Sequence, residues 1–210
     1  FSLEYLGHDE HQGSYEAFTM TVLSALIGQC YAGSMVTLYV FYELMTLLSV
    51  PMVVHERTPQ AVAAGVKYLI YSIFGAMMGL LGIFFLAPYG GIGNFVPGGN
   101  LDPALLAGHE DLALAMFFVA IIGFGCKAGL LPLHAWLPTA HPIAPAPASA
   151  VLSGVITKAG VLCVIRFLYF VVGADLVRGT WVQTTLIILS LITVFMGSMM
   201  AFKTNGLKKR

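Results

Sequence analysis

Long apolar runs alternate with short polar connections along the whole chain. Six of these runs approach or exceed the roughly 20 residues that a helix needs to cross the hydrocarbon core of a bilayer. They predict membrane helices over residues 16–32, 34–54, 60–87, 111–139, 144–172 and 180–202. The pattern therefore predicts an all-α membrane protein with about six transmembrane helices.

The fourth run carries helix breakers in its second half. Pro132 and Pro138 interrupt a stretch that is otherwise long enough to span a membrane, and Gly129 comes just before them. Proline ends or kinks a helix, and a broken helix at membrane depth occurs where it lines protein or a cavity. We therefore expect one discontinuous helix over residues 111–139. In the next segment, HPIAPAPASA, three prolines predict a stiff extended lead-in to the fifth helix, in which His141 is either structural or a gate.

The polar connections divide the chain into three parts. Residues 1–15 form a polar connection, residues 16–172 hold five helices, and residues 180–210 hold a sixth helix with a basic end. Residues 89–110 are rich in glycine and proline and are predicted to be a long polar loop. The chain begins without a methionine and stops soon after its last apolar run, so we expect it to belong to a longer protein.

Basic residues in the short connections indicate the orientation. Six spans put both chain ends on one side, which carries Arg57, Lys203, Lys208, Lys209 and Arg210. The other side carries Arg178. Because connections rich in lysine and arginine stay in the cytoplasm, we expect both ends to be cytoplasmic.

The composition excludes several classes of protein. Hydrophobic residues make up 58% of the chain and charged residues 10%, whereas a soluble domain carries roughly 25% charged residues. Ten Lys and Arg balance ten Asp and Glu, so the formal net charge is zero. A soluble enzyme, a disordered chain and a nucleic-acid binder, which would show a basic footprint, are therefore excluded.

The candidate metal and redox ligands form no recognisable site. Cys30, Cys126 and Cys163 lie far apart in apolar stretches without a CxxC pair, which is typical of small buried hydrophobic residues. We expect no disulfide, iron–sulfur cluster, haem or other cofactor. The sequence His-Asp-Glu-His at residues 8–11 lacks ligand spacing on a defined element, and we interpret it as a solvated loop and not as a metal site.

Ionisable residues inside the predicted spans are the main functional candidates. Such a residue at the bilayer centre costs roughly 2.5–3.5 kcal/mol, so it should face protein or water. Glu43, Lys127 and Lys158 each lie near the middle of a span, and in a bundle they would share one level. We interpret this row as a proton path, because a proton crossing hydrocarbon needs titratable groups. The alternative is a static ion pair between Glu43 and one lysine that only fixes helix packing.

A mechanism follows from this interpretation. Burial lowers the pKa of a lysine and a neighbouring carboxylate raises it, so a lysine whose glutamate partner is neutralised can release its proton. We expect Glu43 to pair with Lys127, and loss of that pair to send a proton toward Lys158. Three further groups are possible relays: Lys67, His134 and His141.

Three stretches resemble a known membrane family. They are FYELMTLLS around Glu43, KYLIYSIFG at Lys67, and GCKAGLLPLHAWLPTAHPIAPAPASAVLSGVITKAGV, which contains Lys127 and Lys158. These stretches are similar to the antiporter-like subunits of respiratory complex I, to Mrp-type Na+/H+ antiporters and to the membrane arms of energy-converting hydrogenases. The resemblance covers essentially the whole chain.

The resemblance implies a fold and a set of functional residues. Proteins of this family contain two inverted five-helix repeats, so residues 16–172 would be the first repeat and residues 180–210 the first helix of a truncated second repeat. The family's glutamate in the ELM motif corresponds to Glu43, its lysine in the broken helix to Lys127, and a further lysine of some branches to Lys158.

The resemblance also implies a function and partners. We expect a proton-translocating, antiporter-like subunit of a redox-driven membrane complex or of a multisubunit cation/proton antiporter, without a redox cofactor of its own. Its partners would be other membrane subunits, homologous antiporter-like subunits among them, and the lipid bilayer of a bacterial or archaeal cell membrane. Two alternatives stay open: a non-conducting structural subunit that braces a larger complex, and a Na+/H+ exchanger subunit.

Overall fold

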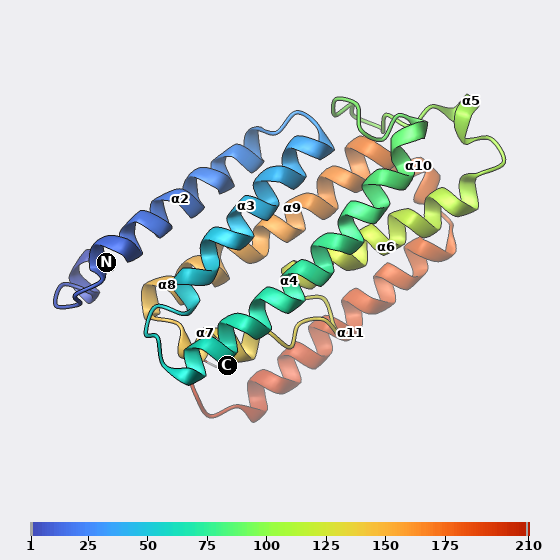
Figure 1. Cartoon of the computed structure of the whole chain (residues 1–210). Coiled ribbons are helices and arrows are strands. Elements are labelled where there is room, and N and C mark those ends of the chain that lie inside the picture. Colours follow the sequence, from blue (N-terminus) through green and yellow to red (C-terminus); the bar gives the residue numbers. More distant parts are fainter. Residues whose placement is uncertain (1, 209) are drawn as a thin grey trace.

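The apolar runs form long helices that lie side by side in the computed structural model, which describes residues 2–208 and 210 (Figure 1). Lys209, one of the expected cytoplasmic basic residues, and Phe1 lie outside the described residues. The long helices are α2 (Gln12–Tyr31), α3 (Met35–Val53), α4 (Pro59–Leu86), α6 (Glu110–Ala128) and α11 (Trp181–Lys203). The short ones are α1 (Ser2–Tyr5), a 3-10 turn (Ala87–Tyr89), α5 (Pro103–Leu106), α7 (Leu137–Ile143) and α10 (Ala174–Val177).

The fifth predicted span is one helical stretch with two wider turns. It consists of α8 (Ala146–Val151), a π-helical segment (Leu152–Ile156), α9 (Thr157–Phe167) and a second π-helical segment (Leu168–Val172). Within the described residues, the strand-like structure amounts to one isolated bridge between Ser34 and Asn94. The predicted all-α class is therefore confirmed.

Five of the described helices are long and apolar enough to cross a membrane: Met35–Val53, Pro59–Tyr89, Glu110–Ala128, Ala146–Val172 and Trp181–Lys203. The sequence pattern predicted about six. The remaining helix, α2, has 20 residues and lies along α3 (Figure 1). It begins at Gln12, about one turn before the predicted start at Glu16, and its first turns carry polar residues that lower its mean hydropathy.

Local signals set where the helices begin. The Ser34 side chain accepts a hydrogen bond from the Thr37 backbone N–H at the start of α3, and the Thr58 side chain accepts one from Ala61 at the start of α4. Such N-caps satisfy backbone donors that have no partner within the helix. Pro59 occupies the first position of α4, where a missing N–H costs nothing.

Small residues bring α4 and α6 into close contact. A Cβ atom added to Gly82 would lie 2.6 Å from the Ala120 Cβ, and one added to Gly79 would lie 2.7 Å from the Phe124 ring. Glycine therefore permits a backbone approach that a larger side chain would prevent.

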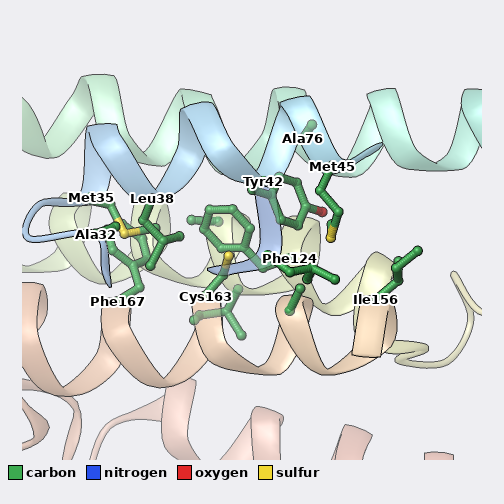
Figure 2. Close-up of a cluster of buried hydrophobic side chains, with 14 of the residues drawn as sticks. Ala32, Met35, Leu38, Tyr42, Met45, Ala76, Phe124, Ile156, Cys163 and Phe167 are labelled. Carbon is green, nitrogen blue, oxygen red and sulfur yellow. The ribbon is translucent and has the colours of Figure 1, made fainter. Parts of the chain in front are cut away.

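The centre of the bundle is filled by aromatic and sulfur-containing side chains. Figure 2 shows Tyr42 of α3, Phe124 of α6, and Cys163 and Phe167 of α9 packed together. Cys126 and Cys163 are buried as expected, but Cys30 is exposed on α2, so its predicted burial is wrong. The physical reason is that Cys30 lies on the side of α2 that faces away from this core.

The predicted discontinuous helix is confirmed. Helix α6 ends at Ala128, Gly129 follows with φ of 92°, and residues 129–136 are not α-helical until α7 begins. The predicted extended lead-in is wrong for most of its length, because residues 137–143 are helical and the chain turns only at residues 144–145. Helix α7 tolerates Pro138 because this residue lies in the first turn.

The two ends of the bundle differ in character. Both chain ends lie at one end (Figure 1). At the other end, the connection between α4 and α6 is tied down by backbone hydrogen bonds, from Phe95 N to Gly33 O at 2.8 Å and from Asn100 N to Val171 O at 2.9 Å. Helix α11 lies at the edge of the bundle (Figure 1) and buries only Val182 among its described residues.

Candidate functional site

Four buried hydroxyl side chains of α3 and α4 lie opposite the end of α6. Thr46 and Ser49 are three residues apart on α3, and Tyr68 and Ser72 are four apart on α4. These spacings put each pair on one face of its helix. The two faces meet around a single charged side chain from α6.

That side chain is Lys127, which lies in the last turn of α6 and is only 1% exposed. Its Nζ donates hydrogen bonds to Thr46 Oγ1 at 2.9 Å, to Tyr68 OH at 2.7 Å and to Ser72 Oγ at 3.3 Å. An ammonium group has three N–H donors, so three hydroxyl oxygens accept all of them. Nζ also lies 4.6 Å from the centroid of the Tyr68 ring, a distance that permits a cation–π interaction.

Glu43 is near this group but is not in contact with it. It lies about one turn from Thr46 on α3 and is half-buried, and its Oε1 accepts a hydrogen bond from Tyr39 OH at 3.2 Å. The described residues form two ion pairs, both near the ends of the bundle: His55–Asp9 and Arg178–Asp175. The direct pair of Glu43 with Lys127 expected from the sequence is therefore not formed. Lys127 lies at the very end of α6, so its side chain meets α3 at Thr46 and not at Glu43.

Lys158 lies elsewhere, on an exposed side of α9. Its Nζ donates to the Ser153 backbone oxygen at 2.7 Å and to Thr157 Oγ1 at 3.4 Å. Ser153 belongs to the π-helical segment that precedes α9. Lys158 borders a groove of about 430 Å³ between α2 and α9. The structure therefore does not bring Lys158 into the hydroxyl site around Lys127.

Lys67 joins α4 to the broken helix. Its Nζ donates to Thr139 Oγ1 of α7 at 3.0 Å. The neighbouring residue on α4 is Tyr68, which contacts Lys127. Lys67 and Tyr68, which are consecutive residues of α4, therefore contact the helices on the two sides of the break: Lys67 contacts α7 and Tyr68 contacts the end of α6.

His134 and His141 border a cavity of about 690 Å³ at the end of the bundle that holds both chain ends. It lies between the α7–α8 region and the last turns of α11, where Lys203 also lines it. His141 Nδ1 lies 2.9 Å from Ser149 Oγ, whereas His134 Nδ1 is buried without a hydrogen-bond partner. The two histidines thus share a cavity, while Lys127 does not line it.

The break itself is held by several hydrogen bonds. Gly129 adopts a left-handed conformation that suits glycine, and the Leu130 N–H donates to Gly125 O at 2.8 Å. The indole of Trp136 donates to Cys126 O at 3.0 Å. Because the C-terminal end of a helix carries partial negative charge, the end of α6 also favours the ammonium of Lys127. Pro132 and Pro138 lie within and just after the break.

Reasoning from the sequence identified the lysine but missed its partners. Thr46, Tyr68 and Ser72 lie in apolar runs, and hydroxyl groups in such runs commonly bond to their own helix. A signal was nevertheless available, because Tyr68 and Ser72 repeat at helical spacing next to Lys67, and Thr46 follows Glu43 at the same kind of spacing.

The arrangement can hold and pass a proton. Hydroxyl groups both donate and accept hydrogen bonds, so they can stabilise the charged lysine and also exchange protons with it.

Across the part of the chain that the structure describes, no group of three or more His, Cys, Asp or Glu side chains could hold a metal ion.

Comparison with known proteins identifies the family. Residues 32–210 match the family described as NADH:quinone oxidoreductase/Mrp antiporter, TM. The NADH-quinone oxidoreductase subunit N of Desulforudis audaxviator is 35% identical over 163 residues, covering 78% of this chain and 32% of that protein. Hydrogenase-4 component B of Escherichia coli is 28% identical over 215 residues, covering 100% of this chain and 30% of that protein. A Na(+)/H(+) antiporter subunit of Alkalihalophilus pseudofirmus is 24% identical over 212 residues, covering 100% of this chain and 41% of that protein.

A solved structure supports the fold. A chain of the membrane-bound sulfane sulfur reductase, an archaeal respiratory membrane complex, superposes with a TM-score of 0.70 at 22% identity, covering 89% of this chain and 36% of that chain. This chain spans between 30% and 41% of the three relatives named above. The family match over most of the length shows that the chain belongs to the NADH:quinone oxidoreductase/Mrp antiporter family of multi-pass, antiporter-like membrane subunits.

Proposed function

We propose that this chain translocates protons as part of a redox-driven membrane complex or a multisubunit cation/proton antiporter, and that Lys127 takes up and releases the proton. The observation that carries the proposal is the almost fully buried ammonium of Lys127, which three hydroxyls solvate without a contacting carboxylate. A buried charge without a counter-ion is expensive. Loss of one proton removes that cost, so the site is suited to change its charge.

Glu43 acts in this proposal through its field and not through contact. It lies about one turn, or roughly 4.5 Å along the α3 axis, from Thr46, and Thr46 binds the ammonium. At such separations charges in a protein interior still interact appreciably. A negative Glu43 favours the charged form of Lys127, and its neutralisation favours proton release toward Lys158. Because Lys158 lies on an exposed face, groups outside this chain would complete the row.

The names of the relatives support the proposed partners, because each relative is named as a subunit or component of an oxidoreductase, a hydrogenase or an antiporter. We infer that this chain assembles with other membrane subunits, homologous antiporter-like ones among them. The end of the bundle with both termini carries Arg57, Lys203, Lys208 and Arg210, which favours a cytoplasmic location for that end.

The experiment is to replace Lys127 by Met in the complete protein and to measure proton uptake into native membrane vesicles with a pH-sensitive dye. Methionine has a similar length and no charge, so it keeps much of the packing. We expect proton transport to fall by at least about tenfold at an equal level of assembled protein. The control is Arg178→Met, which removes an exposed basic group at the opposite end of the bundle and should transport like the unmodified protein.

The outcomes separate the alternatives. Unchanged transport in Lys127→Met would contradict the proposal. If the unmodified protein and Lys127→Met both assemble into the complex and neither transports protons, the result would favour the structural subunit. Transport that requires Na+ on the opposite side of the membrane would favour the exchanger.

A further inference from the structure

The three hydroxyls around Lys127 differ in where their own protons go. Thr46 Oγ1 donates to the backbone oxygen of Tyr42 at 2.8 Å. Tyr68 OH lies 2.6 Å from another hydroxyl, Ser49 Oγ. In the described part of the chain, this is the one hydroxyl-to-hydroxyl contact that continues away from the lysine.

The direction of these hydrogen bonds follows from the charge of the lysine. The ammonium can only donate, so Tyr68 OH accepts from Lys127 at 2.7 Å and gives its own proton to Ser49. Ser49 Oγ in turn donates to the backbone oxygen of Thr46 at 2.8 Å. Lys127, Tyr68 and Ser49 therefore form a continuous hydrogen-bonded chain.

We propose that Tyr68 and Ser49 are the relay through which Lys127 exchanges its proton with the end of the bundle that holds both chain ends. This inference rests on the proposed function. Ser49 lies about one turn closer to that end than Thr46, and the next turn of α3 ends at Met52, which borders a cavity of about 190 Å³ lined also by His55.

The transfer conserves protons and charge. Lys127 gives one N–H proton to the Tyr68 oxygen, and the former Tyr68 proton passes to the Ser49 oxygen. The Ser49 hydroxyl then turns away from the Thr46 backbone oxygen and gives its former proton to a water molecule that enters from the end of the bundle that holds both chain ends. The lysine becomes a neutral amine, water becomes hydronium, and both hydroxyls end with one proton each. The reverse sequence recharges the lysine. Thr46 cannot serve in the same way, because its own proton points to the Tyr42 backbone oxygen and, among the described residues, no second hydroxyl follows it, whereas Tyr68 OH is followed by Ser49 Oγ.

The test replaces Ser49 by Ala and Tyr68 by Phe in the complete protein, in native membrane vesicles. We expect each to lower proton transport by about tenfold or more while the level of assembled protein stays the same. Ser49 does not touch Lys127, so its effect cannot come from a lost contact to the ammonium. Ser49→Thr keeps the hydroxyl and should restore transport, and the solvent deuterium isotope effect should change in the Ala and Phe variants.

Tyr42 is a matched control for Tyr68. It is also fully buried, and its ring centroid lies 5.8 Å from Lys127 Nζ, but its hydroxyl has no hydrogen-bond partner. Tyr42→Phe should therefore transport normally. Equal losses in Tyr42→Phe and Tyr68→Phe would mean that removing any buried tyrosine hydroxyl near Lys127 disturbs the site, whether or not it belongs to the hydrogen-bonded chain, and would overturn the relay.

The outcomes also separate the relay from the function on which it rests. If Lys127→Met abolishes transport while Ser49→Ala and Tyr68→Phe leave it unchanged, the relay is wrong and the proposed function stands. If Lys127→Met transports normally, both fail. If Tyr68→Phe does not assemble, Ser49→Ala alone decides.

Discussion

Gly160 lies where α9 passes the last turn of α6. A Cβ atom there would lie 2.7 Å from the Ala128 nitrogen, 2.9 Å from the Phe124 oxygen and 3.1 Å from the Lys127 Cβ. Two of these atoms belong to the backbone of α6, which cannot move without shifting the helix. The missing side chain of Gly160 thus sets how closely α9 covers the site.

We predict that Gly160→Ala lowers the free energy of unfolding by about 1–3 kcal/mol, as overpacking of a close contact does. Thermal unfolding in detergent measures this change. Gly154→Ala is the control, because it lies in the same helical stretch and a Cβ there meets nothing within 4 Å, so this variant should gain about 0.5–1 kcal/mol from the higher helix propensity of alanine. Equal stability of the two variants would show that α9 does not approach α6 this closely.

Among the elements, the break between α6 and α7 controls the position of Lys127. Gly129 has φ of 92°, and a Cβ there would also lie 2.8 Å from Leu137 Cδ1. Alanine at such a φ is strained. A side chain at Gly129 would therefore strain the backbone at the end of α6 and also press against Leu137, the first residue of α7.

We predict that Gly129→Ala destabilises the protein by about 1 kcal/mol and also lowers proton transport. Gly108→Ala introduces the same kind of backbone strain, since Gly108 has φ of 82°. A Cβ there meets nothing within 4 Å, and Gly108 lies far from the break. It should lose stability but keep its transport rate per assembled protein. If both variants transport equally, the geometry of the break does not control the site.

Across the bundle as a whole, the chain's first residues are tied to the end of α3. Asp9 Oδ1 accepts a hydrogen bond from the His11 backbone N–H at 2.8 Å, and Asp9 Oδ2 lies 3.1 Å from His55 Nε2. The His11 hydrogen bond, and then the one from His55, hold the pKa of Asp9 below its ordinary value of 3.8. A lowered pKa means that this carboxylate stabilises the fold above its ordinary pKa, and that the contribution is lost as the pH falls through the lowered value.

We predict that Asp9→Asn loosens residues 2–11 at neutral pH, because the amide cannot supply the negative charge. Hydrogen exchange of this segment should become faster, with little change in the long helices. Glu10→Gln is the control, since Glu10 is exposed and takes part in none of the hydrogen bonds or ion pairs found among the described residues. Equal exchange in the two variants would mean that Asp9 does not anchor the segment.

The division of the chain into repeats also concerns the bundle as a whole. Residues 16–172 as a first repeat and residues 180–210 as the start of a second remain a prediction. Helix α11 contacts the rest through a hydrogen bond from Leu131 N to Thr193 Oγ1 at 3.1 Å and through the rings of Phe118 and Trp181. Most of its surface is exposed and apolar, which suits a helix that meets lipid or further protein.

Hydropathy and the positions of proline and glycine were enough to predict the class of the protein, most of the membrane helices, the break after Gly129 and the presence of charged residues in apolar runs. These signals act locally along the chain, so they can be read without knowing how the helices pack. The lower hydropathy of residues 16–32 could also have been read from the sequence. What these signals could not show is that α7 is helical, because it is a short segment that contains two prolines.

The groups that meet at Lys127 were set by packing between helices and could not be predicted. Its three hydroxyl partners are 81, 59 and 55 residues away in the chain, and Glu43 stays about one turn from Thr46 while Lys158 faces outward. Which face of each helix turns inward depends on close contacts such as that of Gly160 with the end of α6. Those contacts join segments that are distant in sequence, so no local pattern contains them.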